Sequence, residues 1–183
     1  FYQSFLIVRR DSPHARLEDL RGGSFAFTDP HSNTGKLVPT AWLAELGERP
    51  ETFFRETIYT YSHDNSILAV ARGLVDGAAV DGLVWEYYKE KNPELAARTQ
   101  VIRKSESYGN PPLVASRFLP PGERQALQNL LFTMHQDPQG QKILAELLIE
   151  RFVPLEEQWY DGIRRLHERL NPGKEAGHGA QDP

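Results

Sequence analysis

Five short apolar segments alternate with segments of helical periodicity along the first part of the chain, and this alternation restricts the fold more than any other feature. The apolar segments are residues 5–9, 24–27, 57–61, 75–80 and 99–103. Between most of them, apolar side chains recur every three or four residues, the spacing that gives a helix one buried face. Strands that alternate with helices predict a mainly parallel α/β sheet with helices on its faces.

The last third of the chain predicts helices without alternating strands. We expect helices at about 121–135, 138–149 and 155–170, where leucine and isoleucine recur at helical spacing. A short apolar run at 113–115 predicts one further strand. Because amphipathic helices must bury their apolar faces against other elements, this part of the chain predicts a second packing region.

The predicted elements suggest two lobes, with the chain crossing between them near residues 10 and 105. The chain opens inside an apolar strand, so we expect earlier sequence to precede it and to form much of the first lobe. The expected division is residues 1–10 as a remnant of lobe 1 and a hinge strand, 11–104 as lobe 2, 105–170 as a mostly helical return to lobe 1, and 171–183 as a disordered tail rich in Gly, Pro and charge.

Composition excludes several classes of function. The formal net charge is −4, which does not favour nucleic acid as a partner. The chain has no cysteine, so it has no disulfides, thiol catalysis or thiolate metal sites. The histidines do not have the spacing of metal ligands, and we expect no metal and no cofactor. No apolar run approaches the roughly 20 residues that a membrane helix needs.

Polar residues at 32–34 follow the apolar segment 24–27 and precede a helix predicted at about 35–46. Ligands of open α/β sheets bind at the carboxyl ends of strands, and a helix start there offers free N–H groups and a positive dipole end. The hydroxyls of Ser32 and Thr34 and the amide of Asn33 add donors for an anion. Ordinary helix capping by the same residues is the alternative interpretation.

His63 and Asp81 each follow a later predicted strand, so we expect them near the same sheet edge. A ring N–H of His63 would bond an anion oxygen, and a partly charged imidazole would add Coulomb attraction. Asp81 would accept a hydrogen bond from a ligand amine or a protonated ligand oxygen. A surface histidine and a helix N-cap are the alternatives. Tyr108, in a polar loop where the chain is expected to cross between lobes, is a candidate cleft residue.

Two enzyme interpretations meet difficulties in the sequence. Gly35-Lys36 is followed by Leu37, and the required first glycine is absent, so the loop is not an ATPase phosphate loop. Ser32, His63 and Asp81 would suit a hydrolase triad, but Ser32 lacks the G-x-S-x-G turn and no oxyanion hole is evident.

Taken together, the segments resemble the phosphonate- and phosphite-binding proteins of ABC importers. The resemblance covers about residues 5–170, and no single segment is specific by itself. The matching segments are residues 17–22, 25–35, 62–65, 69–81, 110–112, 137–140 and 151–154, of which 25–35 reads FAFTDPHSNTG and 74–81 reads LVDGAAVD.

The resemblance implies a type II periplasmic-binding fold: two α/β lobes joined by a hinge, with the first lobe incomplete in this chain. It implies a periplasmic or membrane-tethered, non-enzymatic protein that delivers a phosphonate or phosphite to a membrane permease. It further implies that Ser32, Asn33, Thr34 and His63 hold the oxyanion and that Asp81 assists. The family often has Ser or Thr where this chain has Asn33. The sensing domain of a histidine kinase with the same fold is the alternative.

Overall fold

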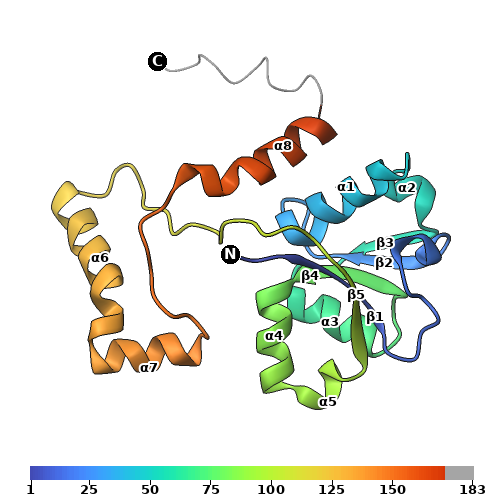
Figure 1. The fold of residues 1–183 in the computed structure, drawn as a ribbon, viewed down its shortest axis with the longest axis horizontal. Coiled ribbons are helices and arrows are strands. Elements are labelled where there is room, and N and C mark those ends of the chain that lie inside the picture. Colours follow the sequence, from blue (N-terminus) through green and yellow to red (C-terminus); the bar gives the residue numbers. More distant parts are fainter. Residues whose placement is uncertain (172–183) are drawn as a thin grey trace. The chain divides into compact units, whose positions relative to one another are not determined.

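The computed structural model describes residues 1–171 (Figure 1). The disordered tail expected at 171–183 lies, apart from Asn171, outside the described residues. The described residues divide into two compact units, one made of residues 1–109 and 159–171 and the other of residues 110–158.

The first unit is built on a five-stranded sheet with the order β3-β2-β4-β1-β5. β2 pairs in parallel with both β3 and β4, whereas β1 is antiparallel to its neighbours β4 and β5. Four of the five strands therefore run in one direction, but the reversed β1 makes two of the four pairings antiparallel, so the sheet is mixed rather than mainly parallel as predicted. The strands are β1 Ser4–Arg9, β2 Ser24–Phe27, β3 Glu56–Tyr59, β4 Gly77–Asp81 and β5 Thr99–Lys104.

Helices cover both faces of this sheet, with α1 and α2 on one face and α3, α4 and α5 on the other (Figure 1). The predicted helices at these positions are confirmed within a few residues, and the one-turn helices α2 and α5 were not predicted. The elements are η1 Leu17–Leu20, η2 Asn33–Leu37, α1 Val38–Glu45, α2 Pro50–Phe53, α3 His63–Ala71, α4 Gly82–Lys91, α5 Pro93–Ala96, η4 Glu157–Tyr160 and α8 Asp161–Leu170.

Alternation along the strands divides the apolar side chains between two cores. In β1, Leu6 and Val8 belong to one core, while Phe5 and Ile7 belong to the other. The first core also contains the rings of Phe25 and Phe54, which stack with their centroids 4.5 Å apart. Full burial of each large apolar side chain stabilises the fold by about 1.5–3 kcal/mol. These two cores fix the strands in place, and the candidate site lies where three of these strands end.

The expected lobe boundaries stay a prediction, but the structure shows where the segments pack. β1, within the segment expected to be a remnant of the first lobe, lies between β4 and β5 in a sheet whose other four strands all come from residues 11–104. Residues 159–171 belong to this same unit, and Ile163 and Leu166 of α8 pack against its first core.

The second unit consists mainly of helices, with few buried side chains. Its elements are α6 Pro121–Thr133, η3 Met134–Gln136 and α7 Pro138–Glu146. The strand predicted at 113–115 is wrong, because no strand forms there and the side chain of Val114 is 87% exposed. A strand needs a neighbour to take its backbone hydrogen bonds, and apolar composition by itself does not supply one.

Limited proteolysis of the 183-residue chain is expected to cut first between residues 110 and 158. α6 has no buried residue and α7 buries only Gly140 and Leu144, so local opening of this unit costs little free energy. A trypsin time course read by mass spectrometry should show early cleavage at Arg117, Arg124 and Lys142. Equally early cuts inside β1 to β5 would contradict this expectation.

Candidate functional site

The candidate residues gather at one edge of the sheet because of strand direction. β2, β3 and β4 end at this edge, which places Ser32, His63 and Asp81 there. β1 runs in the opposite direction, and Ser4 at its start pairs with Asp81 at the end of β4. The residues that precede β1 therefore meet the residues that follow the other strands.

Residues 33–37 form a π-helical turn that leads into α1. The N–H of Leu37 donates to the carbonyl of Ser32 at 3.0 Å, five residues earlier, and the N–H of Val38 donates to Asn33. Such wide turns are frequently found at functional sites. Because the first N–H groups of any helix have no intrahelical acceptor, this turn presents donors and the positive end of the helix dipole at the sheet edge.

Ser32 is a helix cap, and its hydroxyl is still able to donate. Its Oγ accepts the N–H of Gly35 at 2.9 Å, which uses an oxygen lone pair and leaves the hydroxyl hydrogen for another acceptor. The capping and anion-binding interpretations of Ser32 are therefore compatible. Thr34 is 2% exposed, and its carbonyl accepts the hydroxyl of Ser4 at 2.6 Å, which ties the turn to the start of β1.

Asn33 contacts a residue that sequence reasoning missed. Its side-chain amide donates to the hydroxyl of Tyr2 at 3.0 Å, while its own Oδ1 is buried without a hydrogen-bond partner. Tyr2 and Tyr108 form an isolated backbone bridge and an edge-to-face ring pair with centroids 6.2 Å apart. Tyr2 stands before an apolar strand, and no sequence signal shows that this strand runs antiparallel to its neighbours.

His63 is held by two groups that approach the same ring nitrogen. The backbone N–H of Asp81 donates to Nδ1 of His63 at 3.0 Å, and the hydroxyl oxygen of Thr28 lies 3.2 Å from it. A nitrogen that accepts an N–H carries no proton, so the neutral ring has its proton on Nε2. Burial lowers the pKa of His63 below its ordinary value, with smaller opposing effects of Asp81 and Asp64. The ring thus offers a neutral N–H donor, and the Coulomb attraction expected from the sequence is not supported.

Asp81 is the N-cap of α4. Its Oδ1 accepts the N–H groups of Leu83 and Val84, at 2.8 and 3.4 Å. Burial raises the pKa of Asp81, while the Leu83 and Val84 N–H groups and His63 act in the opposite direction. The half-buried carboxylate at this edge suits a ligand group that donates a hydrogen bond.

The geometry does not support the hydrolase triad considered from the sequence. In such a triad the acid accepts the proton on one ring nitrogen while the other ring nitrogen receives the proton of the serine. Here Nδ1 of His63 accepts the backbone N–H of Asp81, and the Asp81 carboxylate caps a helix instead. Ser32 Oγ is bonded to the backbone of its own turn.

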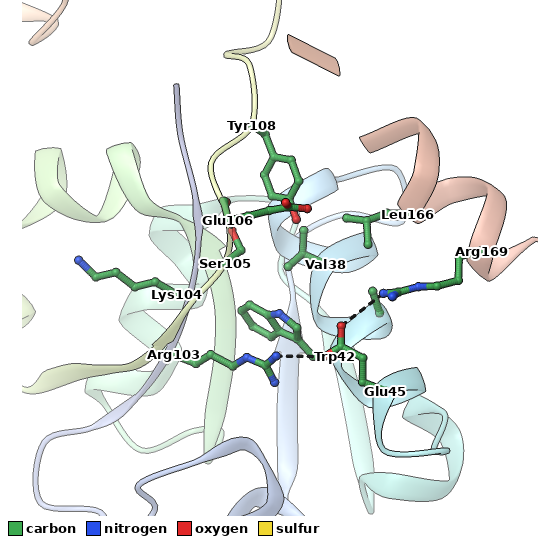
Figure 2. Close-up of a pocket in the computed structure, with 11 residues that line it drawn as sticks. Val38, Trp42, Glu45, Arg103, Lys104, Ser105, Glu106, Tyr108, Leu166 and Arg169 are labelled. Atoms are coloured by element: carbon green, nitrogen blue, oxygen red, sulfur yellow. Dashed lines mark hydrogen bonds and ion pairs between the residues drawn. The ribbon is translucent and has the colours of Figure 1, made fainter. Parts of the chain in front are cut away.

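Tyr108 lies in the first core and is only 3% exposed. Burial raises its pKa to about 12, so it is a neutral phenol at any physiological pH. It lines a pocket of about 260 Å³ between α1, the end of β5 and α8, where Glu45 bonds both Arg103 and Arg169 (Figure 2). A direct contact between Tyr108 and a ligand stays a prediction.

Within residues 1–171, no group of three or more His, Asp or Glu side chains is placed to hold a metal ion. Over the same residues, no helix has both the length and the apolar character needed to cross a membrane.

The sheet carries the turn at residues 33–37, here called the donor turn, where β2, β3 and β4 end and the reversed strand β1 begins. This architecture is that of a type II periplasmic-binding protein, of which the chain forms a part. The family model described as "ABC transporter, phosphonate, periplasmic substrate-binding protein" matches residues 1–160. The chain belongs to this family.

Curated relatives have similar sequences over most of this chain. The phosphate-import protein PhnD of Mycolicibacterium smegmatis is 28% identical over 185 residues, which cover 90% of this chain and 57% of the relative. The phosphonates-binding periplasmic protein of Escherichia coli is 28% identical over 150 residues, which cover 80% of this chain and 44% of the relative. The chain thus spans about half the length of the curated relatives that it matches.

Solved structures agree with the fold. A binding protein component of an ABC phosphonate transporter from Pseudomonas aeruginosa has a TM-score of 0.79 and 29% identity, covering 91% of this chain and 56% of that one. PhnD1 from Prochlorococcus marinus, solved in complex with methylphosphonate, has a TM-score of 0.77 and 21% identity, covering 92% and 66%. The second similarity supports the fold alone.

Proposed function

We propose that this protein binds a small phosphorus oxyanion, a phosphonate or phosphite, and delivers it to the permease of an ABC importer. The observation that carries the proposal is the π-helical turn at Asn33–Leu37, which lies at the same sheet edge as the neutral N–H donor of His63. The family membership and the names of the relatives, which include phosphate, phosphonate and phosphite, support the class of ligand.

The donors around this edge suit a tetrahedral anion. The hydroxyl hydrogen of Ser32, the N–H groups at the start of the turn and Nε2–H of His63 are all neutral donors. Neutral donors replace the water around an anion without bringing a counter-charge, and the helix dipole adds to their effect. This matters because the chain as a whole is negatively charged and does not attract anions by its net field.

The side-chain amide of Asn33 satisfies Tyr2 in either of two orientations. The two ends of an amide are assigned from their surroundings, and the present orientation leaves Oδ1 without a partner. In the reversed orientation the hydroxyl of Tyr2 donates to Oδ1, and the amide N–H groups occupy the buried position that now has no hydrogen-bond partner. A contact between Asn33 and the anion, at the position where the family resemblance led us to expect a Ser or Thr hydroxyl, stays a prediction.

Asp81 supports a preference for ligands that carry a hydrogen-bond donor. A half-buried carboxylate beside an oxyanion site repels a fully deprotonated anion and accepts a hydrogen bond from a P–OH group or an ammonium group. We include 2-aminoethylphosphonate among the candidate ligands for this reason. The sensing domain of a histidine kinase is the alternative with the same fold, and no feature of residues 1–171 favours it.

A thermal-shift panel tests the proposal. The full-length gene product is heated with phosphate, sulfate, phosphite, methylphosphonate or 2-aminoethylphosphonate, and a ligand at 100 times its dissociation constant should add about 2.7 kcal/mol of apparent stability. We expect a shift with at least one phosphorus anion and none with sulfate. The Ser32→Ala variant should lose the shift, whereas Ser12→Ala, a matched change outside this edge, should keep it. No shift with any phosphorus anion would overturn the ligand assignment.

A further inference from the structure

Thr28, the residue after β2, is buried beneath the candidate site and has no assigned role. It is 4% exposed, and its backbone N–H donates to the carbonyl of Gly35 at 3.3 Å. Its carbonyl accepts the N–H of Tyr61 at 2.7 Å, just before the start of α3. Thr28 is therefore joined to both segments that carry ligand-binding candidates, the turn at 33–37 and the start of α3.

The side chain of Thr28 faces the ring of His63. Its Oγ1 lies 3.2 Å from Nδ1 of His63 and 3.3 Å from the carbonyl oxygen of Ala79, and these two acceptors share its single hydroxyl hydrogen. Valine has the same shape and would fill the same space without a buried hydroxyl. Since a buried hydroxyl is unfavourable unless it is hydrogen-bonded, the two acceptors within reach account for a threonine here.

We propose that Thr28 is a positioning residue: with the N–H of Asp81, its hydroxyl holds the His63 ring so that Nδ1 is the acceptor and Nε2–H is presented to the bound anion. The tautomer and the ring plane are thereby set before the ligand arrives, so binding needs no reorganisation of the donor. The anion in this statement rests on the proposed function, whereas the tautomer and its control by Thr28 do not.

The position of Thr28 also links the donor turn to the histidine. A Cβ atom on Gly35 would come within 2.4 Å of Thr28 Oγ1 and within 2.5 Å of Thr28 Cβ. The turn is therefore packed directly on the residue that holds the ring. The charged groups that face His63 are Asp81 and Asp64, and neither carboxylate accepts a hydrogen bond from the ring.

Nitrogen NMR of the histidine rings tests the proposal without any ligand. In the chain labelled with ¹⁵N-histidine, the His63 signals are assigned from their loss in His63→Gln. We expect the Nε2–H tautomer and a titration midpoint below that of an exposed histidine. In Thr28→Val the midpoint should move upward, because one donor to the neutral ring is lost. In Thr28→Ser, which restores the hydroxyl, it should return.

Ligand titration gives the second readout. For the phosphorus anion with the largest thermal shift, Thr28→Val should weaken binding roughly five- to tenfold, and Thr28→Ser should recover most of that loss. An unchanged His63 titration and unchanged affinity in Thr28→Val would show that Thr28 only fills space. If Thr28→Val does not fold, the ¹⁵N spectrum of the native protein still tests the proposal, because an Nδ1–H tautomer of His63 would overturn it. If no phosphorus anion binds, the proposed function is wrong, but the ¹⁵N signals of the His63 ring still test the role of Thr28.

Discussion

Replacing Gly35 with alanine is expected to destabilise the protein by about 3 kcal/mol, the upper part of the range for overpacking a buried position. The new Cβ would lie 2.4–2.5 Å from the side chain of Thr28 and 3.0 Å from Oγ of Ser32. Thr28 is fixed by backbone hydrogen bonds to Gly35 and Tyr61, so the contact is not relieved by a side-chain rotation alone. For a chain of this length the melting temperature should fall by roughly 6–12 °C.

A glycine in another helix supplies the control. Gly122, in the first turn of α6, has no atom within 4 Å of an added Cβ, so Gly122→Ala should leave the melting temperature unchanged or slightly higher. Gly35→Ala should also weaken anion binding, because the turn must move away from Thr28 and with it the donors of residues 32–34. A Gly35→Ala protein with the melting temperature and affinity of the native chain would show that the turn is not packed as described.

Substituting His63 by asparagine is expected to weaken anion binding roughly 10- to 150-fold, the cost of one hydrogen bond to a charged group. The asparagine Oδ1 is two bonds from Cβ, as Nδ1 of histidine is, so it can accept the N–H of Asp81 and preserve the fold. It has no donor at the position of Nε2. Calorimetric titration with the preferred anion and chemical unfolding measure the two effects separately.

Glutamine at the same position should give the opposite pattern. Its Nε2 is three bonds from Cβ, as in histidine, so a donor to the anion is retained. The N–H of Asp81 loses its acceptor, which should lower the free energy of unfolding by about 1–3 kcal/mol. His14→Asn, at a histidine near the opposite ends of β1 and β4, should alter neither quantity. Strong binding by His63→Asn would contradict the assignment of Nε2–H as a ligand donor.

These two experiments examine one connected structure. Gly35 contacts Thr28, Thr28 contacts His63, and His63 contacts the backbone of Asp81, so residues that follow β2, β3 and β4 form a continuous path along the sheet edge. A change at one member should therefore alter affinity through the next, and paired substitutions at Gly35 and His63 should not be additive.

Much of the fold was predictable from local patterns. The apolar segments became β1 to β5, of which all but the exposed edge strand β3 bury side chains on the sheet, and the segments of helical spacing became α1, α3, α4, α6, α7 and α8. The strand predicted at 113–115 failed because a strand also requires a partner, which local composition does not reveal.

Part of the candidate site was likewise predictable from the sequence, and part was not. The amino-acid sequence by itself determined which side chains follow each strand, and hence that Ser32, Asn33, Thr34, His63 and Asp81 lie at one edge. Only the tertiary structure decided that β1 is reversed, which brings Tyr2 against Asn33, and that the N–H of Asp81 and the hydroxyl of Thr28 lie against Nδ1 of the His63 ring. The reason is physical: the order of strands along the chain is a local property, whereas strand direction and hydrogen-bond partners depend on contacts between residues far apart in the sequence.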